Sequence, residues 1–79
     1  MRSEIRVPKI REGEKKKGVI IRWYREDGDR VKKDEEIAEV MIEKLTLHIT
    51  APEDGILTIF TRENEEIEED STIGFVETE

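Results

Sequence analysis

Side chains that could carry chemistry are sparse in this chain. It has no cysteine and a single histidine, His48, so it offers no thiolate nucleophile and no Cys/His set for a metal. His48 alternates with Thr46 and Thr50, which predicts a solvated strand face. The acidic run at residues 65–70 lacks the spaced oxygen ligands and turn glycine of a calcium loop, and we interpret it as a charged surface. We expect no catalytic residue and no metal ligand.

The pair Glu43-Lys44 is the one position where a reactive side chain coincides with an unusual local pattern. Apolar residues alternate up to Ile42 and again from Leu45, but their phase changes between these two residues. The chain must therefore turn at Glu43-Lys44, which predicts a hairpin near residues 42–46 with Lys44 at its tip. This turn lacks the Asn-Gly or Asp-Gly pair of tight hairpins, so a requirement other than turn propensity selected it.

The elements that must position this hairpin are short strands. The five glycines divide the chain into segments, and none sustains a helical apolar period. The sequence therefore predicts an all-β fold. The predicted strands run over residues 5–10, 18–25, 36–42, 44–51, 56–62 and 72–77, with short extended pieces near Val31 and Ile67.

The second half of the chain repeats the first. One constant shift aligns Gly28 with Asn64 and Asp34 with Asp70, which are residue types suited to turns with positive φ. We predict a flattened β-barrel or sandwich of two four-stranded sheets, packed about a pseudo-twofold axis with the hairpin at the midpoint of the repeat. The predicted core consists of Ile21, Trp23, Val31, Ile37, Val40, Leu57, Ile59, Ile67, Ile73 and Val76.

Length and charge exclude several classes of function. With 79 residues, 34% of them hydrophobic, residues 1–79 are expected to form a single small domain without the cleft of an enzyme. A net charge of −7 disfavours nucleic acid. No apolar run is long enough to span a membrane, and the start turns acidic too soon for a signal peptide, so we expect a cytoplasmic protein. The excess of Glu, Lys and Arg over amides suggests a thermophilic source.

Three further clusters have plainer explanations. Trp23 and Tyr24 could stack on bases, but their repeat partners Ile59 and Phe60 indicate apolar packing positions. The lysines at residues 15–17 and 32–33 fall in predicted turns among acidic residues, which is typical of solvated loops.

These patterns together resemble the lipoyl domains found in the acyltransferase component of 2-oxo-acid dehydrogenase complexes, within the biotinyl/lipoyl carrier group. The resemblance covers nearly the whole chain. The motifs that carry it are, in order, Val7-Pro8-Lys9-Ile10 followed by Glu12-Gly13, then residues 18–23, 27–33 and 38–40, the pair Glu43-Lys44, and Ala51-Pro52-Glu53-Asp54-Gly55.

The resemblance implies a carrier and not a catalyst. In the family, the lysine at the hairpin tip is amidated by lipoic acid, which carries this role onto Lys44. Glu43, Ile42 and Leu45 would then be recognised by a lipoate ligase, and the loop at residues 11–17 would contact the decarboxylase. A cysteine-free chain would in this way import its redox group on a covalent cofactor.

The resemblance also implies the partners. A thiamin-diphosphate 2-oxo-acid decarboxylase acylates the carrier, the acyltransferase catalytic domain transfers the acyl group to coenzyme A, and dihydrolipoyl dehydrogenase reoxidises the dithiol. Tethering makes these encounters intramolecular at high effective concentration. The isolated domain is expected to be a monomer.

Two alternatives stay open at this point. A biotin carboxyl carrier domain usually has its lysine between two methionines, whereas the neighbours here are Glu43 and Leu45 and the nearest methionine is Met41. An unmodified lipoyl-like interaction module would use the same fold without the lysine. Three positions depart from the lipoyl pattern: Arg11 stands where glycine is common, the second-half turn reads Glu63-Asn64-Glu65-Glu66 instead of a Glu-Gly-Asp type, and Leu45 is larger than the usual residue after the lysine.

Overall fold

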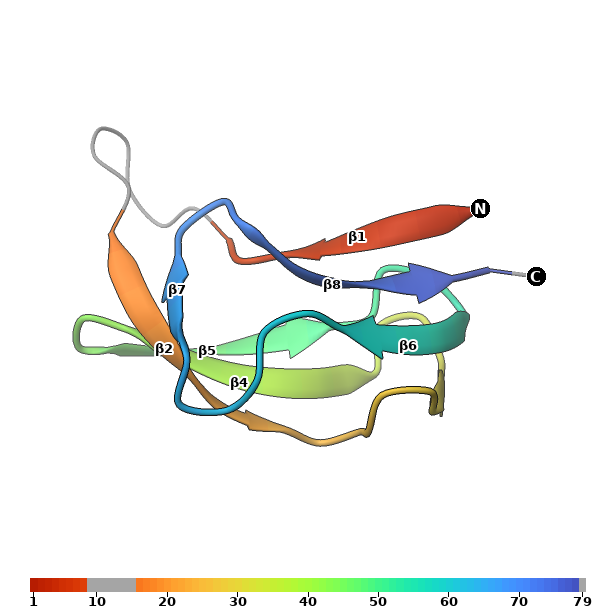
Figure 1. Ribbon diagram of the computed structural model, residues 1–79, viewed down its shortest axis with the longest axis horizontal. Coiled ribbons are helices and arrows are strands. Elements are labelled where there is room, and N and C mark those ends of the chain that lie inside the picture. The colour runs from red at the N-terminus through yellow and green to blue at the C-terminus, as the bar shows by residue number, and fades with distance from the viewer. Residues whose placement is uncertain (9–15, 79) are drawn as a thin grey trace.

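The computed structural model describes residues 1–8 and 16–78, and the regular structure there is entirely β (Figure 1). The all-β prediction is therefore confirmed. A search of the described residues finds no helix able to cross a membrane. The strands are β1 (Arg2–Arg6), β2 (Lys17–Trp23), β3 (Arg30–Val31), β4 (Glu36–Ile42), β5 (Leu45–Thr50), β6 (Gly55–Ile59), β7 (Glu66–Glu68) and β8 (Thr72–Glu77).

The strands form two four-stranded antiparallel sheets, in the orders β1-β8-β6-β3 and β5-β4-β2-β7. The sheets face each other as a flattened sandwich, 36 × 22 × 18 Å, and do not close into a barrel (Figure 1). Alternate side chains of both sheets meet between them. The buried apolar side chains are Ile5, Val7, Ile20, Val31, Ile37, Ala38, Val40, Ile42, Ile49, Ala51, Leu57, Ile67, Ile73 and Val76.

The internal repeat is visible in the sheet order itself. Replacing β1 to β4 by β5 to β8, and the reverse, converts one sheet into the other. The matched turn residues all have positive φ: 92° at Gly28 and 69° at Asn64, and 71° at Asp34 and 63° at Asp70. The pseudo-twofold axis therefore relates turns as well as strands, which is what the residue types at these positions predicted.

Seven of the ten predicted core residues are buried, whereas Ile21, Trp23 and Ile59 are half-buried. Ile20 is fully buried, whereas Ile21 is only half-buried. The register between β2 and β4 shifts after Ile20, so one extra residue enters β2 as a bulge. The backbone agrees, because Gly28 N–H donates to Leu57 O at 2.7 Å and Asn64 N–H donates to Ile20 O at 2.8 Å. Ile20, and not Ile21, is thus the equivalent of Leu57.

Other differences concern strand ends. Trp23 and Ile59 pack against the core while remaining half-buried, because each is the last residue of its strand. The strand predicted at residues 5–10 is observed at Arg2–Arg6, with residues 9 and 10 outside the described part of the chain. The N-terminal strand starts earlier than its apolar pattern suggests because β8 offers it a complete pairing partner.

Candidate functional site

The Glu43-Lys44 pair forms the connection between β4 and β5. The two strands pair along their length, and Ile42 faces Leu45 as the last pair before the turn. A two-residue connection therefore places Lys44 at the tip of a protruding hairpin. Figure 1 shows this hairpin at one end of the long axis, with both chain termini at the opposite end.

The backbone of the turn is conformationally costly. Glu43 has a φ of 55°, in the left-handed region that L-residues other than Asn and Asp rarely enter. Gly28 also has a positive φ, of 92°, but its turn carries no such conformational cost because glycine has no Cβ. A glutamate held in this conformation indicates a position selected for its side chain.

Lys44 is exposed, and its ammonium group has no hydrogen-bond or ion-pair partner within the part of the chain that the structure describes. The hairpin is nevertheless anchored at its base, since Ile42 is 1% exposed and belongs to the core. Beyond it, the exposed fraction rises to 44% at Leu45, and Met41 on the other strand face is 38% exposed. A fixed base thus presents a free amine flanked by accessible apolar side chains.

Among the described residues, one ion pair joins the tip to the rest of the molecule. Lys16 Nζ lies 3.8 Å from Glu43 Oε1, and both side chains are partly exposed. Of the predicted decarboxylase loop at residues 11–17, positions 11–15 fall outside the described residues. Lys16 and Lys17 are described, and the contact places the end of that loop beside the hairpin.

Sequence reasoning missed Glu69. The acidic run was interpreted as a charged surface, yet Glu69 is 0% exposed. Its Oε1 accepts the backbone N–H of Lys16 at 2.7 Å, and its own N–H donates to Lys16 O at 2.9 Å. A turn residue between two apolar strands, aligned by the repeat with Lys33, gives no sequence signal of burial. The prediction fails here because a tertiary hydrogen bond, and not local pattern, decides the position.

His48 lies on the exposed outer face of β5, as the alternation predicts, with its Nδ1 2.9 Å from Glu36 Oε2. Among residues 1–8 and 16–78, no group of three or more His, Cys, Asp or Glu side chains is placed to hold a metal ion. This pair is a surface contact on the sheet.

The two adjacent aromatic residues are engaged in the fold. Trp23 Nε1–H donates to Thr61 O at 2.8 Å. The Tyr24 hydroxyl donates to Glu39 Oε1 at 3.2 Å. Loss of water around that hydroxyl, followed by the hydrogen bond and charge of Glu39, raises the pKa of Tyr24. Trp23 also packs against the core, as the packing interpretation predicted, but that interpretation is wrong for Tyr24, which is 37% exposed, and for its repeat partner Phe60, which is 55% exposed.

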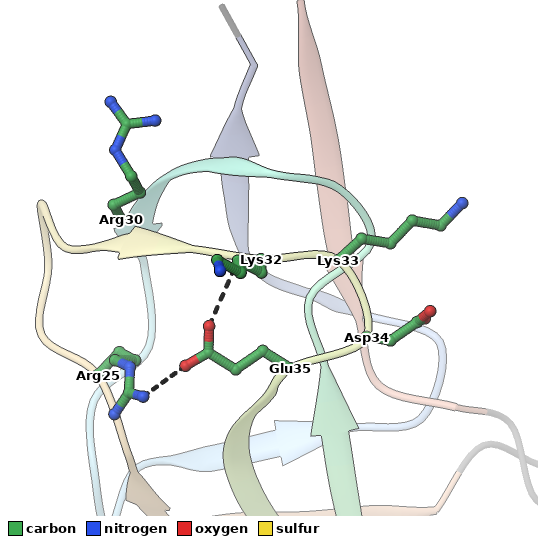
Figure 2. A pocket seen from close by; sticks show the side chains of 6 residues that line it. All are labelled: Arg25, Arg30, Lys32, Lys33, Asp34 and Glu35. Atoms are coloured by element: carbon green, nitrogen blue, oxygen red, sulfur yellow. Dashed lines mark hydrogen bonds and ion pairs between the residues drawn. The ribbon is translucent and has the colours of Figure 1, made fainter.

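A shallow depression beside β3 gathers four basic and two acidic residues, but it does not form a convergent site. Arg25 is paired with Glu35 at 2.6 Å, and the other oxygen of Glu35 accepts the Lys32 N–H at 3.0 Å. Figure 2 shows the side chains of Arg30 and Lys33 pointing away from this pair and from each other. The segment at residues 30–35, which supplies most of its lining, lies toward the opposite end of the long axis from the hairpin (Figure 1).

Comparison with known proteins identifies the family. The family profile described as "Biotin-requiring enzyme", the biotin/lipoyl profile, matches residues 3–76. The lipoyl domain of the 2-oxoglutarate dehydrogenase complex from Azotobacter vinelandii has the same fold, with a TM-score of 0.75, 24% identity and 95% of each chain covered. The chain therefore belongs to the biotin/lipoyl attachment family.

Within that family, the names of similar proteins refer to a dihydrolipoyllysine residue. A dihydrolipoyllysine-residue succinyltransferase component of the 2-oxoglutarate dehydrogenase complex from Rickettsia conorii is 40% identical over 72% of this chain. A probable mitochondrial one from Schizosaccharomyces pombe is 36% identical over 77%. The dihydrolipoyllysine-residue acetyltransferase component of the acetoin cleaving system of Bacillus subtilis is also 36% identical over 77%. These relatives favour a lipoyl domain over a biotinyl domain.

The match covers a small part of each relative. The aligned region spans 14% of the Rickettsia conorii and Schizosaccharomyces pombe proteins and 16% of the Bacillus subtilis protein. The chain therefore corresponds to less than a fifth of the length of these relatives.

Proposed function

We propose that Lys44 is amidated by lipoic acid and that the domain carries acyl groups and reducing equivalents between the active sites of a 2-oxo-acid dehydrogenase complex. The observation that carries the proposal is the position of Lys44, a free amine at the tip of a hairpin whose base is locked into the core. The names of the similar proteins support a lipoyl group at this position.

The residues around Lys44 fit a long covalent arm. The ammonium side chain is exposed and makes no ion pair with another described residue, so attachment breaks no contact there. Bound lipoate would supply a disulfide that accepts an acyl group and two electrons. The protein's own contribution is to hold the attachment point rigid, away from the sheets, and within reach of other enzymes.

Recognition by a lipoate ligase would fall on the residues beside the lysine. Glu43 offers a carboxylate fixed by its left-handed backbone, and Leu45 offers an exposed apolar side chain. Ile42 is buried, so its contribution is indirect: it fixes the strand from which the turn departs. The ligase-recognition surface proposed here is therefore Glu43 and Leu45, supported by Ile42.

The proposed partners are a thiamin-diphosphate decarboxylase, an acyltransferase catalytic domain and dihydrolipoyl dehydrogenase, in the cytoplasm. Two of the similar proteins described above are named as components of 2-oxoglutarate dehydrogenase. A 2-oxoglutarate complex is accordingly the first to test as the source of the acyl group. The domain performs no bond chemistry in this scheme.

The test is intact mass before and after incubation with lipoate, ATP and a lipoate ligase, followed by peptide mapping. A parallel arm uses biotin, ATP and a biotin ligase, because the family profile also describes biotin-requiring proteins. We expect addition of one lipoyl group at Lys44. Biotin addition would assign the chain to the carboxylases, and failure of both ligases would leave the unmodified interaction module.

The Lys44→Ala variant tests whether the lysine is required for modification without being required for folding. We expect the free energy of unfolding to change by no more than about 0.5 kcal/mol, because the side chain is exposed at a turn. Lipoylation should be abolished. Lys33→Ala, which removes an exposed lysine near the other end of the sandwich, is the matched control and should be modified like the parent. A large drop in melting temperature for Lys44→Ala would show that the lysine is packed.

A further inference from the structure

Glu69 is fully buried, and it lies in the connection between β7 and β8. Removing a carboxylate from water costs free energy, so its retention requires compensating contacts. The Lys16 N–H supplies such a contact, 2.7 Å from the Glu69 carboxylate, and the backbone N–H of Glu69 in turn donates to Lys16 O at 2.9 Å. One buried residue therefore fixes the backbone of Lys16 from two sides.

The connection between β7 and β8 also binds Val7, which precedes residues 8–16 in the chain. Asp70 N–H donates to Val7 O at 2.9 Å, and Val7 N–H donates to Ser71 O at 2.9 Å. Residues 69–71 thus bind the chain immediately before and at the end of this segment. The positions of Val7 and Lys16 are set by one short turn.

The internal repeat shows that the fold does not require a buried acid here. The residue equivalent to Glu69 is Lys33, which is exposed and points away from the sheets (Figure 2). Its turn forms without it, since Asp34 N–H donates to Ala51 O at 2.9 Å just as Asp70 N–H donates to Val7 O. The buried carboxylate is therefore a feature of one end of the sandwich, the end that carries Lys44.

Lys16 connects this anchor to the hairpin. Its side chain reaches Glu43, with Nζ 3.8 Å from Oε1, and Glu43 is the turn residue with a φ of 55° that directly precedes Lys44. Glu69 thus holds the backbone of Lys16, and the side chain of Lys16 lies against the carboxylate beside the carrier lysine.

We propose that Lys16 is a positioning residue for Lys44. With its backbone anchored on Glu69, it holds Glu43 in the left-handed conformation, and this sets the direction in which Lys44 leaves the hairpin. The functional part of this proposal rests on lipoylation at Lys44. The structural part concerns the unmodified chain and is testable by itself.

The first experiment is solution NMR of the unmodified domain with Lys16→Gln, Lys16→Arg and Arg22→Gln. Arg22→Gln is the matched control, because it removes a comparable ion pair, 3.9 Å to Glu39, from near the far end of β2, the strand that follows Lys16. We expect Lys16→Gln to shift the amide resonances of Glu43 and Lys44 and to change the HN–Hα coupling that reports φ at Glu43. Lys16→Arg should retain the parent values, and so should Arg22→Gln.

The second experiment measures lipoylation kinetics with lipoate ligase and the same variants. Lys16→Gln should raise the KM for the domain about two- to fivefold, the range of an exposed ion pair, with kcat unchanged. Arg22→Gln should match the parent. Glu69→Ala should move the Lys16 and Glu43 resonances together if it folds, and Lys16→Gln keeps the test independent of that.

The outcomes separate the two proposals. If the parent chain accepts no lipoyl group, the proposed function fails, whereas the NMR experiment still decides how Lys16 acts on the turn. If Lys16→Gln leaves the Glu43 coupling and the ligase KM at parent values, or if Arg22→Gln changes them equally, the positioning role is overturned.

Discussion

The two ends of the sandwich are built from equivalent strands, but the chain continues through a turn at one end and has its termini at the other. At one end, β4 continues into β5 through Glu43-Lys44. At the pseudo-symmetric end, β8 and β1 pair in the same way, but the chain termini lie there, and Thr78 N–H donates to Met1 O at 2.7 Å. The same pair of strands therefore supports a closed tip at one end and an open one at the other.

Comparing the two ends separates features that the fold requires from features that belong to the hairpin tip. Features that occur at both ends, such as the positive φ of Asp34 and Asp70, are needed to close the sandwich. Features that occur only at the hairpin end, the left-handed Glu43 and the buried Glu69, are not. Four sets of variants test this distinction between the two ends.

The largest effect is expected at two equivalent glycines. A Cβ on Gly18 would lie 2.1 Å from Met41 O, and one on Gly55 would lie 2.2 Å from Glu77 O. Backbone atoms in paired strands cannot move aside easily, so each change to Ala should cost about 3 kcal/mol. Chemical denaturation of both variants should give similar losses. A loss at only one site would show that the two ends are not mechanically equivalent.

The next effect should differ between the ends. Glu69→Ala removes a buried acceptor of the Lys16 N–H and should cost about 2 kcal/mol, whereas Lys33→Ala at the equivalent exposed position should cost less than about 0.5 kcal/mol. Urea unfolding of the pair measures the contrast. Equal losses would remove the distinction drawn between the two turns.

A smaller effect of opposite sign is expected in the hairpin turn. Glu43→Gly relieves the left-handed conformation and should stabilise the domain by about 0.5 kcal/mol while slowing lipoylation. Asn64→Gly is the control, since asparagine already tolerates positive φ, and should change the melting temperature less. If Glu43→Gly lowers the melting temperature, the glutamate stabilises its turn and stores no strain.

The smallest effect concerns pH. The backbone N–H of Trp23 binds the Glu63 carboxylate and lowers its pKa, while Asp27 accepts the equivalent bond from Ile59. A lowered folded-state pKa contributes stability that is present above the ordinary glutamate pKa and lost as pH falls through the lower one. Glu63→Gln should therefore flatten the acid limb of the melting temperature against pH. An unchanged limb would mean the bond is not kept in solution.

Much of the fold could be predicted from the sequence because local signals agree with the tertiary structure. The residue types at 28, 34, 64 and 70 predicted the turns, and the change of apolar phase between Ile42 and Leu45 predicted the hairpin. The site geometry was predictable for the same reason, since a two-residue turn leaves Lys44 nowhere else to point.

The features that were not predicted depend on tertiary interactions, which leave no pattern in the local sequence. Ile21 was placed in the core because the bulge in β2 shifts the repeat by one residue, and Ile20 takes that place. The alignment of Gly18 with Gly55, one residue out of step with the other repeat pairs, is the signal that could have revealed the bulge. The burial of Glu69 had no such signal, because its partner Lys16 lies far away in sequence.

The chain termini lie far from Lys44, and this affects how the domain would present the lysine to another protein. Any chain attached at Met1 or Thr78 would leave the domain from the end opposite the hairpin (Figure 1). Such a tether would not pass the tip or compete with it for space in a partner's cleft. The sandwich, 36 Å along its longest dimension, would then act as a rigid spacer between a flexible linker and Lys44.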